Sequence, residues 1–211
     1  MMIEKEVVRR RAGEMRHRQE DKESISARIV QRLMSMPQYV AAETVMWYVD
    51  VRDEVRTRHA LPVALADGKR VVIPYCLGKD LRLFHLHSPA DLSPGAFGIL
   101  EPCEELRRKD DRMVDPADVD WVAVPGVAFD VEGRRLGHGH GFYDRFLAGL
   151  STQAVRVGVG FECQIVARVP TADHDVRMDW IVTQDRTIPC DGRGNERGGG
   201  DPGVRAGGED C

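Results

Sequence analysis

Residues 122–147 read VAVPGVAFDVEGRRLGHGHGFYDRFL. This stretch predicts a buried strand, then a glycine-rich basic loop, and then the start of a helix. The strand ends at Pro125-Gly126, and the loop carries two arginines and three alternating glycines, namely Arg134, Arg135, Gly137, Gly139 and Gly141. N–H groups at a helix start can donate to an anion, glycine lets the backbone approach a ligand, and arginine binds phosphate through two hydrogen bonds. The stretch therefore predicts a phosphate-binding loop.

Two common phosphate loops do not match this segment. The P-loop requires Lys followed by Ser or Thr after its glycines, and no such pair occurs here. The dinucleotide fingerprint requires a glycine three residues after Gly139, where this chain has Phe142. Glycines alone leave a surface turn as the alternative. The flanking arginines, the preceding strand and the following Tyr143-Asp144 pair favour a ligand-binding loop.

The rest of the chain alternates apolar strands with helices. Besides the helix that opens at Phe142, helices are predicted at 3–18, 24–36 and 56–66. Buried strands are predicted at 44–49, 70–73, 121–124, 155–159 and 180–182, with a half-exposed strand at 81–86. Short buried strands that alternate with helices indicate an α/β fold of three α/β/α layers, in which a mostly parallel sheet is covered on both faces.

Length and composition favour a single globular domain. The chain has 211 residues, of which 42% are apolar and 30% charged, and its net charge is −4. That charge disfavours a nucleic-acid-binding module built on the Arg-rich first helix. No apolar run could span a membrane, and the charged N-terminus lacks the apolar core of a secretory signal. Five irregularly spaced cysteines indicate reduced thiols, so we expect a cytoplasmic protein with no nucleic-acid or membrane partner.

The composition changes near the C-terminus. Eight of the 22 residues from Cys190 to Cys211 are glycine, and few are apolar. Such a segment cannot bury enough apolar surface to offset the entropy of ordering it. We therefore expect one domain over 1–189 and a disordered tail over 190–211.

The loop sequence RRLGHGHGFYDRFL resembles the signature of the 5-formyltetrahydrofolate cyclo-ligase family, R-L-G-x-G-x-G-[FY]-Y-D, at every fixed position. The resemblance extends to about Ile188 and includes Lys5, Arg9, 52–57, 124–126, Phe129-Asp130, 174–176 and Asp179. It implies a Rossmann-like fold of the NagB/RpiA/CoA-transferase type, and we expect a monomer. It also implies ATP-dependent closure of 5-formyltetrahydrofolate to 5,10-methenyltetrahydrofolate, with release of ADP and phosphate. A degenerate homologue that binds nucleotide or folate without ring closure is the alternative.

The resemblance also assigns roles to residues of this chain. It implies that ATP binds Lys5, Arg9, Arg135, Gly137, His138, Gly139, His140, Gly141, Phe142 and Tyr143. It implies that the folate contacts Val49, Glu54, His138, Gly139, His140, Gly141 and Phe142. Mg²⁺ is expected on Asp144 and Asp179, and the catalytic residues are Arg135, Tyr143 and Asp144.

The residue patterns alone leave alternatives for several of these positions. Lys5 and Arg9 lie one helical turn apart and can reach one anion, but a solvated basic face has the same pattern. Such a face is the expectation for the other arginines of this helix, Arg10, Arg11, Arg16 and Arg18. Asp144 fits a Mg²⁺ ligand and also an acid favoured at a helix start. Glu54 follows a buried strand, where α/β proteins bind ligands, or is an exposed loop acid.

The two loop histidines are specific to this chain's version of the motif. His138 and His140, together with His174, could suggest a transition-metal site, but their spacing matches no common zinc pattern. We expect His140 to stand where other family members have Lys and to donate a hydrogen bond to a phosphate.

Overall fold

The computed structural model describes residues 2–95, 100–171 and 175–190. Its helices are α1 (Met2–Arg18), α2 (Lys22–Met34), α3 (Pro37–Ala41), α4 (Ala60–Ala66) and α5 (Phe142–Ala148). Its longer strands are β2 (Arg70–Leu77), β3 (Asp80–Leu86), β7 (Trp121–Pro125) and β10 (Val155–Val159). The shorter strands are β1 (Thr44–Met46), β4 (Leu92–Pro94), β5 (Leu100–Pro102), β6 (Met113–Val114), β8 (Ala128–Phe129), β9 (Arg135–Leu136), β11 (Trp180–Val182) and β12 (Thr187–Pro189).

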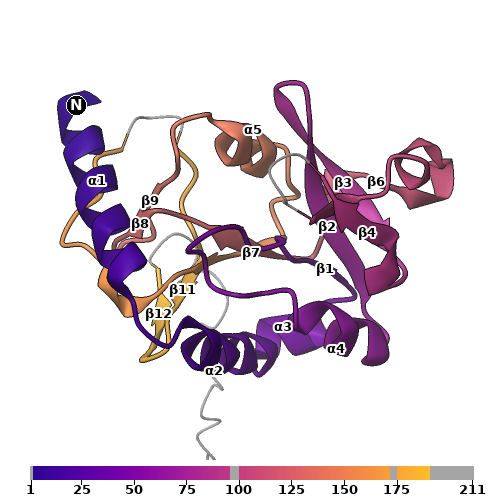
Figure 1. Cartoon of the computed structure of the whole chain (residues 1–211), viewed down its shortest axis with the longest axis horizontal. Coiled ribbons are helices and arrows are strands. Elements are labelled where there is room, and N and C mark those ends of the chain that lie inside the picture. Colours follow the sequence, from indigo (N-terminus) through magenta and orange to yellow (C-terminus); the bar gives the residue numbers. More distant parts are fainter. Residues whose placement is uncertain (1, 96–99, 172–174, 191–211) are drawn as a thin grey trace, which may run out of the picture.

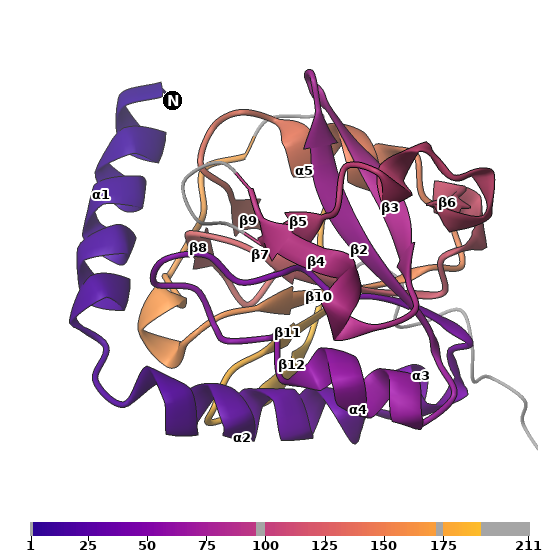
Figure 2. The same ribbon diagram turned by 45° about the vertical axis from the view of Figure 1, so that its right-hand side comes forward.

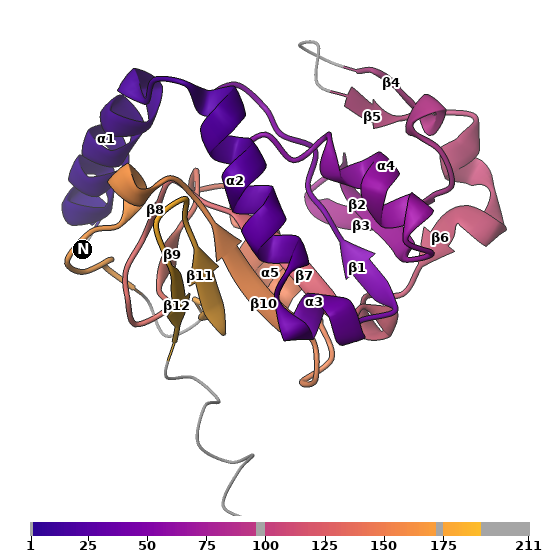
Figure 3. The same cartoon turned by 90° about the horizontal axis from the view of Figure 1, so that it is seen from below.

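Eight of the strands form one sheet in the order β12-β11-β10-β7-β1-β2-β3-β6. The five central strands from β11 to β2 are parallel to one another, whereas β3, β6 and β12 pair antiparallel at the two edges. Helices α2, α3 and α4 cover one face and α5 covers the other (Figures 1 and 3). The predicted α/β fold with a mostly parallel sheet is confirmed.

Both faces of the central strands are buried. In β7, Trp121 and Ala123 pack in the cluster under α2, α3 and α4, while Val122 and Val124 pack in the cluster under α5. All four side chains are 0% exposed. Because each face of the strand meets a helical layer, the strand is apolar throughout rather than alternating with polar residues.

Helix α1 lies apart from the two helical layers (Figures 1 and 2). It packs on the β8–β9 hairpin through Ala12, which shares an apolar cluster with Val127 and Leu136. This contact places the basic side of α1 next to the glycine-rich loop that follows β9.

Helix α4 begins later than the sequence predicts. The prediction covered 56–66, but α4 begins only at Ala60, and the residues before it form a loop. The buried Asp50 carboxylate accepts hydrogen bonds from the N–H of Thr57 (3.0 Å) and the N–H of Arg58 (3.1 Å). These side-chain bonds compete with the first helical turn and hold a fixed loop after β1.

Strand β2 runs through a proline at which the sequence predicted its end. The apolar pattern covered 70–73, but β2 continues past Pro74 to Leu77 and pairs with β3 along its length. On its other side β2 pairs with β1 only as far as Val72. At Pro74 that side is therefore a free edge, where the missing N–H removes no ladder bond.

The last described residue belongs to the domain core. Cys190 is 5% exposed, and its N–H donates to the Asp179 carbonyl (3.0 Å). The predicted tail began at this residue, and its remainder, 191–211, lies outside the described residues. Among the helices that the structure describes, none has the length and apolar character needed to cross a bilayer.

Candidate active site

A pocket of about 200 Å³ opens at the carboxyl ends of β1 and β7. It is lined by Glu54, Cys76, Leu81, Pro125, Gly126, Arg135 and the whole run from Gly137 to Asp144. The structure thus brings Glu54, predicted to contact folate, to the same cavity as the predicted ATP loop. Pockets that enclose a whole drug-sized ligand take about 300–1,000 Å³, so this one fits the ends of larger molecules.

The loop exposes bare backbone to the pocket at two glycines with left-handed conformations. Gly139 has a φ of +97° and Gly141 a φ of +69°, which side-chain-bearing residues adopt only with strain. A Cβ at Gly139 would also lie 3.4 Å from the Arg9 guanidinium. Helix α5 begins directly after the loop, at Phe142, as predicted.

Arg135 lies in the pocket wall and is only 7% exposed. Its Nη2 donates to Asp144 Oδ1 (2.7 Å), and its Nη1 donates to the Pro125 carbonyl (3.2 Å). The guanidinium also lies over the Tyr143 ring, 5.5 Å from the centroid. Its Nε has no hydrogen-bond partner among the residues described. A buried cation with a spare donor at a pocket wall is suited to bind an anion.

The neighbouring arginine of the motif turns away from this pocket. Arg134 pairs with the buried Asp130 (3.1 Å) and also contacts Glu132. Successive residues of an extended chain point to opposite sides, so only Arg135 of the two can serve the pocket. Arg134 instead fixes the turn that precedes β9.

Helix α1 brings two more cations to the loop. The Arg9 Nε donates to the Gly137 carbonyl (2.9 Å), and the Lys5 Nζ donates to Asp175 Oδ2 (2.8 Å). Both side chains are half-buried and contact residues far along the chain. The predicted pair is therefore not a fully solvated basic face.

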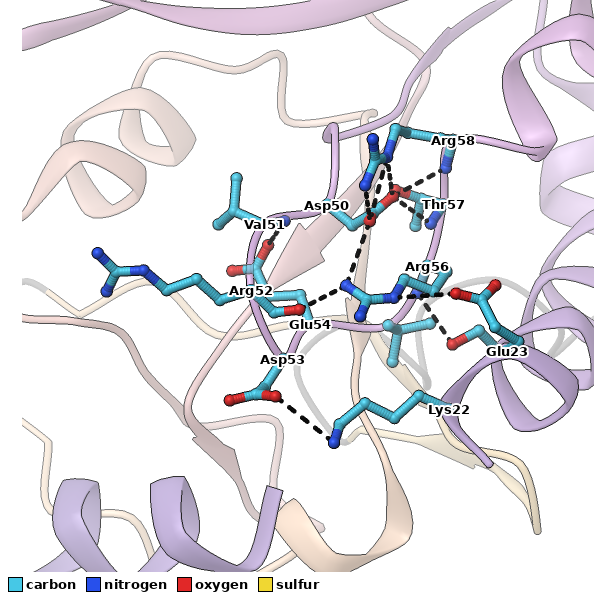
Figure 4. A network of polar contacts seen from close by, with 12 residues as sticks. Lys22, Glu23, Asp50, Val51, Arg52, Asp53, Glu54, Arg56, Thr57 and Arg58 are labelled. Carbon is cyan, nitrogen blue, oxygen red and sulfur yellow. Dashed lines mark hydrogen bonds and ion pairs between the residues drawn. The ribbon is translucent and has the colours of Figure 1, made fainter. Parts of the chain in front are cut away.

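Glu54 reaches the pocket from the loop after β1. Its Oε2 accepts a hydrogen bond from the Val51 N–H (3.0 Å), and its own N–H donates to the Val51 carbonyl (3.1 Å). Arg52, within this turn, has a φ of +51°, a left-handed conformation that costs roughly 1–2 kcal/mol. Figure 4 shows the surrounding charges paired, with Asp50 held by Arg58 and the Arg52 side chain extending away from the network. Glu54 is therefore a buried acid on a loop held by hydrogen bonds, and not an exposed loop acid.

Burial controls the ionisation of Glu54. The side chain is 8% exposed, and loss of solvent raises the pKa of Glu54 to about 7, although the Val51 N–H and the Arg16 cation act to lower it. Burial also raises the pKa of Tyr48 and of Tyr143, and the nearby Glu54 carboxylate raises both further. A carboxyl group that titrates near neutral pH in a cleft is typical of a functional site.

The two loop histidines differ in their surroundings. Desolvation by the surrounding protein and the nearby cations Arg16 and Arg52 lower the pKa of His138, so its ring is neutral at pH 7 and can donate or accept. Both side chains are exposed, and His140 stacks on Phe142, with ring centroids 6.2 Å apart. In the described part of the chain no three His, Cys, Asp or Glu side chains form a metal-ligand cluster, and His174 lies outside that part.

Besides Lys5 and Arg9, which reach the loop from α1, two predicted site residues do not line the pocket, namely Asp179 and Val49. Asp179 precedes β11, and its carboxylate accepts a hydrogen bond from the Arg156 N–H (2.8 Å) near the start of β10. That is the amino edge of the parallel strands, whereas the loop follows the carboxyl edge, so the structure does not bring Asp179 to Asp144. Val49 is half-buried and packs against the core below the Glu54 loop.

The sequence did not reveal three residues that shape this region. Cys76 and Leu81 line the pocket from the β2–β3 hairpin, whose first strand the sequence ended too early. Arg145 joins that hairpin to the loop by donating to the Lys79 carbonyl and the His140 carbonyl. No local sequence pattern predicts these contacts, because they depend on how the β2–β3 hairpin packs against α5.

The geometry and the sequence both match known proteins. A model of the 5-formyltetrahydrofolate cyclo-ligase family matches residues 2–184. The chain is 32% identical to a probable 5-formyltetrahydrofolate cyclo-ligase of Schizosaccharomyces pombe, over 80% of this chain and 87% of the relative. It is 31% identical to the Escherichia coli K12 5-formyltetrahydrofolate cyclo-ligase, over 78% and 90%. The NMR structure of Aquifex aeolicus 5,10-methenyltetrahydrofolate synthetase superposes with a TM-score of 0.77 at 34% identity, covering 93% of this chain and 98% of that chain.

Proposed function

This chain belongs to the 5-formyltetrahydrofolate cyclo-ligase family, and we propose that the pocket between its glycine-rich loop and Glu54 is the active site. The protein catalyses ATP-dependent conversion of 5-formyltetrahydrofolate to 5,10-methenyltetrahydrofolate. The observation that carries the assignment of the site is that residues matched to each of the two substrates line one cavity. The alternative of a degenerate homologue has no support, since Glu54, Arg135, Tyr143 and Asp144 are all in place.

The reaction needs an activated formyl oxygen. That oxygen attacks the γ-phosphorus of ATP, an O–P bond forms, and ADP leaves. N10 of the folate then attacks the formyl carbon and loses its proton, and the C–O bond breaks to release phosphate. Phosphoryl transfer depends mainly on positioning and on neutralising charge, so a site without a nucleophile of its own is sufficient.

In this proposal the loop and its arginines hold the phosphates. Gly139 and Gly141 line the pocket without side chains, and Arg135 offers a fixed, planar set of donors from its wall. Arg9 braces the loop through the Gly137 carbonyl and stands beside Gly139. These groups can bind the γ-phosphoryl group and place it against the folate at the bare backbone.

Glu54 faces the loop across the pocket and binds the folate in this proposal. A charged carboxylate accepts hydrogen bonds from the N–H donors of the pterin ring. All the residues proposed here to bind the two substrates belong to one chain.

The residues present fit a Mg²⁺ ion bound with the nucleotide. Mg²⁺ sites in phosphoryl-transfer enzymes use one or two carboxylates together with substrate phosphates, and the Asp144 side chain is 28% exposed at the pocket. When bound, the ion would neutralise phosphate charge. For a second carboxylate we propose Asp175 in place of Asp179, because Asp175 pairs with Lys5, one turn of α1 before the Arg9 that contacts the loop.

We expect a direct assay to show ring closure. The protein mixed with 5-formyltetrahydrofolate and MgATP should form the methenyl chromophore and release ADP and phosphate in equal amounts. Mixtures lacking ATP or protein are the controls. ATP binding without any chromophore would instead support the degenerate-homologue alternative.

We expect folate affinity to fall in mild acid. The pKa of Glu54 is raised to about 7, so its charged form predominates above that pH and is lost below it. If the charged form accepts the pterin N–H bonds, the dissociation constant of 5-formyltetrahydrofolate should rise as pH falls through about 7. Titration calorimetry without ATP measures this, and Glu54→Gln should bind weakly and independently of pH over the same range. A pH-dependence that persists in that variant would assign it to another group.

A further inference from the structure

Arg16 is a buried cation that the sequence wrongly placed on the solvated face of α1. Its side chain is 7% exposed. Its Nη1 donates to the carbonyl of Gly126 (3.3 Å), which lines the pocket just past the end of β7. Arg16, in the last turn of α1, therefore binds a carbonyl of the pocket wall from behind.

This guanidinium has few partners for its charge. Among the described residues no carboxylate lies within ion-pair distance of Arg16, and its Nε is buried without a hydrogen bond. An unpaired buried charge is strongly unfavourable, so a protein that retains one commonly uses it.

Holding the Gly126 carbonyl does not by itself explain a charged side chain. The buried Gln164 Nε2 already donates to the same carbonyl at 2.8 Å, which is shorter than the bond from Arg16. A neutral donor therefore satisfies this oxygen, and the positive charge of Arg16 is additional.

Arg16 holds a carbonyl of the pocket that Glu54 also lines, and from there its charge favours the charged form of that carboxylate. Among the charged groups around Glu54, Arg16 comes from α1, while Asp50 and Arg56 come from its own loop. The charge of Glu54 also raises the pKa of Tyr48, after β1, and of Tyr143, on α5. Arg56 is already shared with the Asp50 and Glu23 carboxylates. Of the two cations near Glu54, Arg16 is thus the one without a competing carboxylate.

We propose that Arg16 is a positioning residue of the folate site, whose buried guanidinium lies behind the pocket wall and favours the charged form of the Glu54 carboxylate, which accepts hydrogen bonds from the pterin ring. The identity of the ligand rests on the proposed function, but the effect on Glu54 does not. Arg16 also favours the neutral form of His138, whose pKa is lowered mainly by desolvation.

The first test follows the Glu54 carboxyl directly in the ligand-free protein. Carbon-13 NMR of glutamate-labelled protein, with the Glu54 signal assigned by its loss in Glu54→Gln, gives the titration midpoint. In Arg16→Met the midpoint should rise by about one pH unit, because an opposite charge nearby is removed. Arg16→Lys retains the charge and should stay near the wild-type midpoint. Arg18→Met removes an exposed charge from the same turn of α1 and should not move it.

The second test measures 5-formyltetrahydrofolate binding against pH in the same variants. The acidic limb should move upward in Arg16→Met by the same interval as the NMR midpoint, and Arg16→Lys should restore it. If Arg16→Met does not fold, Arg16→Gln is the second neutral variant.

The outcomes separate the two proposals. A Glu54 midpoint unchanged in the neutral variants, or moved equally in Arg18→Met or Arg16→Lys, overturns the role of Arg16. Equal loss of folate affinity at every pH also overturns it, because that is the result of a purely structural role. A wild-type protein that binds no folate, with a midpoint that still moves in Arg16→Met, contradicts the proposed function and leaves the role of Arg16 in charging Glu54 intact.

Discussion

Replacing Arg135 by Met is expected to lower kcat for ring closure by about 10³-fold, the lower end of the contribution of an arginine that stabilises a transferring phosphoryl group. Arg135 is the buried cation of the pocket wall and carries an unpartnered Nε. Steady-state kinetics from the rate of methenyl chromophore formation measure the change. Arg135→Lys keeps the charge but lacks the planar donor set, so it should recover only part of the lost rate.

Arg134 provides the matched control for this prediction. It is the adjacent arginine and is also buried, but it pairs with Asp130 and does not line the pocket. Arg134→Met should lower the free energy of unfolding while kcat of the folded protein stays close to wild type. If Arg134→Met loses turnover as strongly as Arg135→Met, the assignment of the phosphate-binding arginine is wrong.

Asp144→Asn is expected to lower kcat by about 100-fold and to leave the dissociation constant of 5-formyltetrahydrofolate nearly unchanged. The carboxylate of Asp144 is half-exposed at the pocket and bonded to Arg135, where it can bind the nucleotide's Mg²⁺. Loss of a metal-linked charge contact of several kcal/mol in the transition state corresponds to a loss of that size. The variant should also need more Mg²⁺ to reach half-maximal rate.

Two further aspartates make this prediction more specific. Asp175→Asn should raise the Mg²⁺ or ATP requirement, because Asp175 pairs with Lys5, one turn of α1 before the Arg9 that contacts the loop. Asp179→Asn should not, because that carboxylate binds the Arg156 N–H at the opposite edge of the sheet. Activity of Asp144→Asn equal to wild type would remove Asp144 from the site.

The central fold was predictable because its signals are local. Strands such as 121–124 and 155–159 are short apolar runs buried on both faces, and their bounds agree closely with β7 and β10. Predictions were less accurate where a distant or neighbouring group decides the local conformation. The Asp50 carboxylate binds backbone N–H groups before α4, so the helix begins only at Ala60. Strand β1 ends early, which leaves β2 free to continue through Pro74.

The candidate site was predictable to the extent that it is a contiguous motif. The loop from Arg135 to Asp144 resembles a family signature, and the structure places nearly all of it around one pocket together with Glu54. Asp179 was carried over from a looser match, in which two acids lie four positions apart. The motif could not indicate that Asp175 pairs with α1 while Asp179 binds the start of β10, because that depends on the path of the chain between strands.

The sequence by itself determined the α/β class, the phosphate-binding loop and the family, since periodicity and contiguous motifs depend on neighbours along the chain. Only the tertiary structure decided which charged side chains are buried and what they face. Arg16 and Arg18 lie on one turn of α1, yet one is exposed and the other meets a carbonyl 110 positions away. That difference comes from the packing of α1 on the β8–β9 hairpin, because the charge of a side chain acts through whatever the fold places beside it.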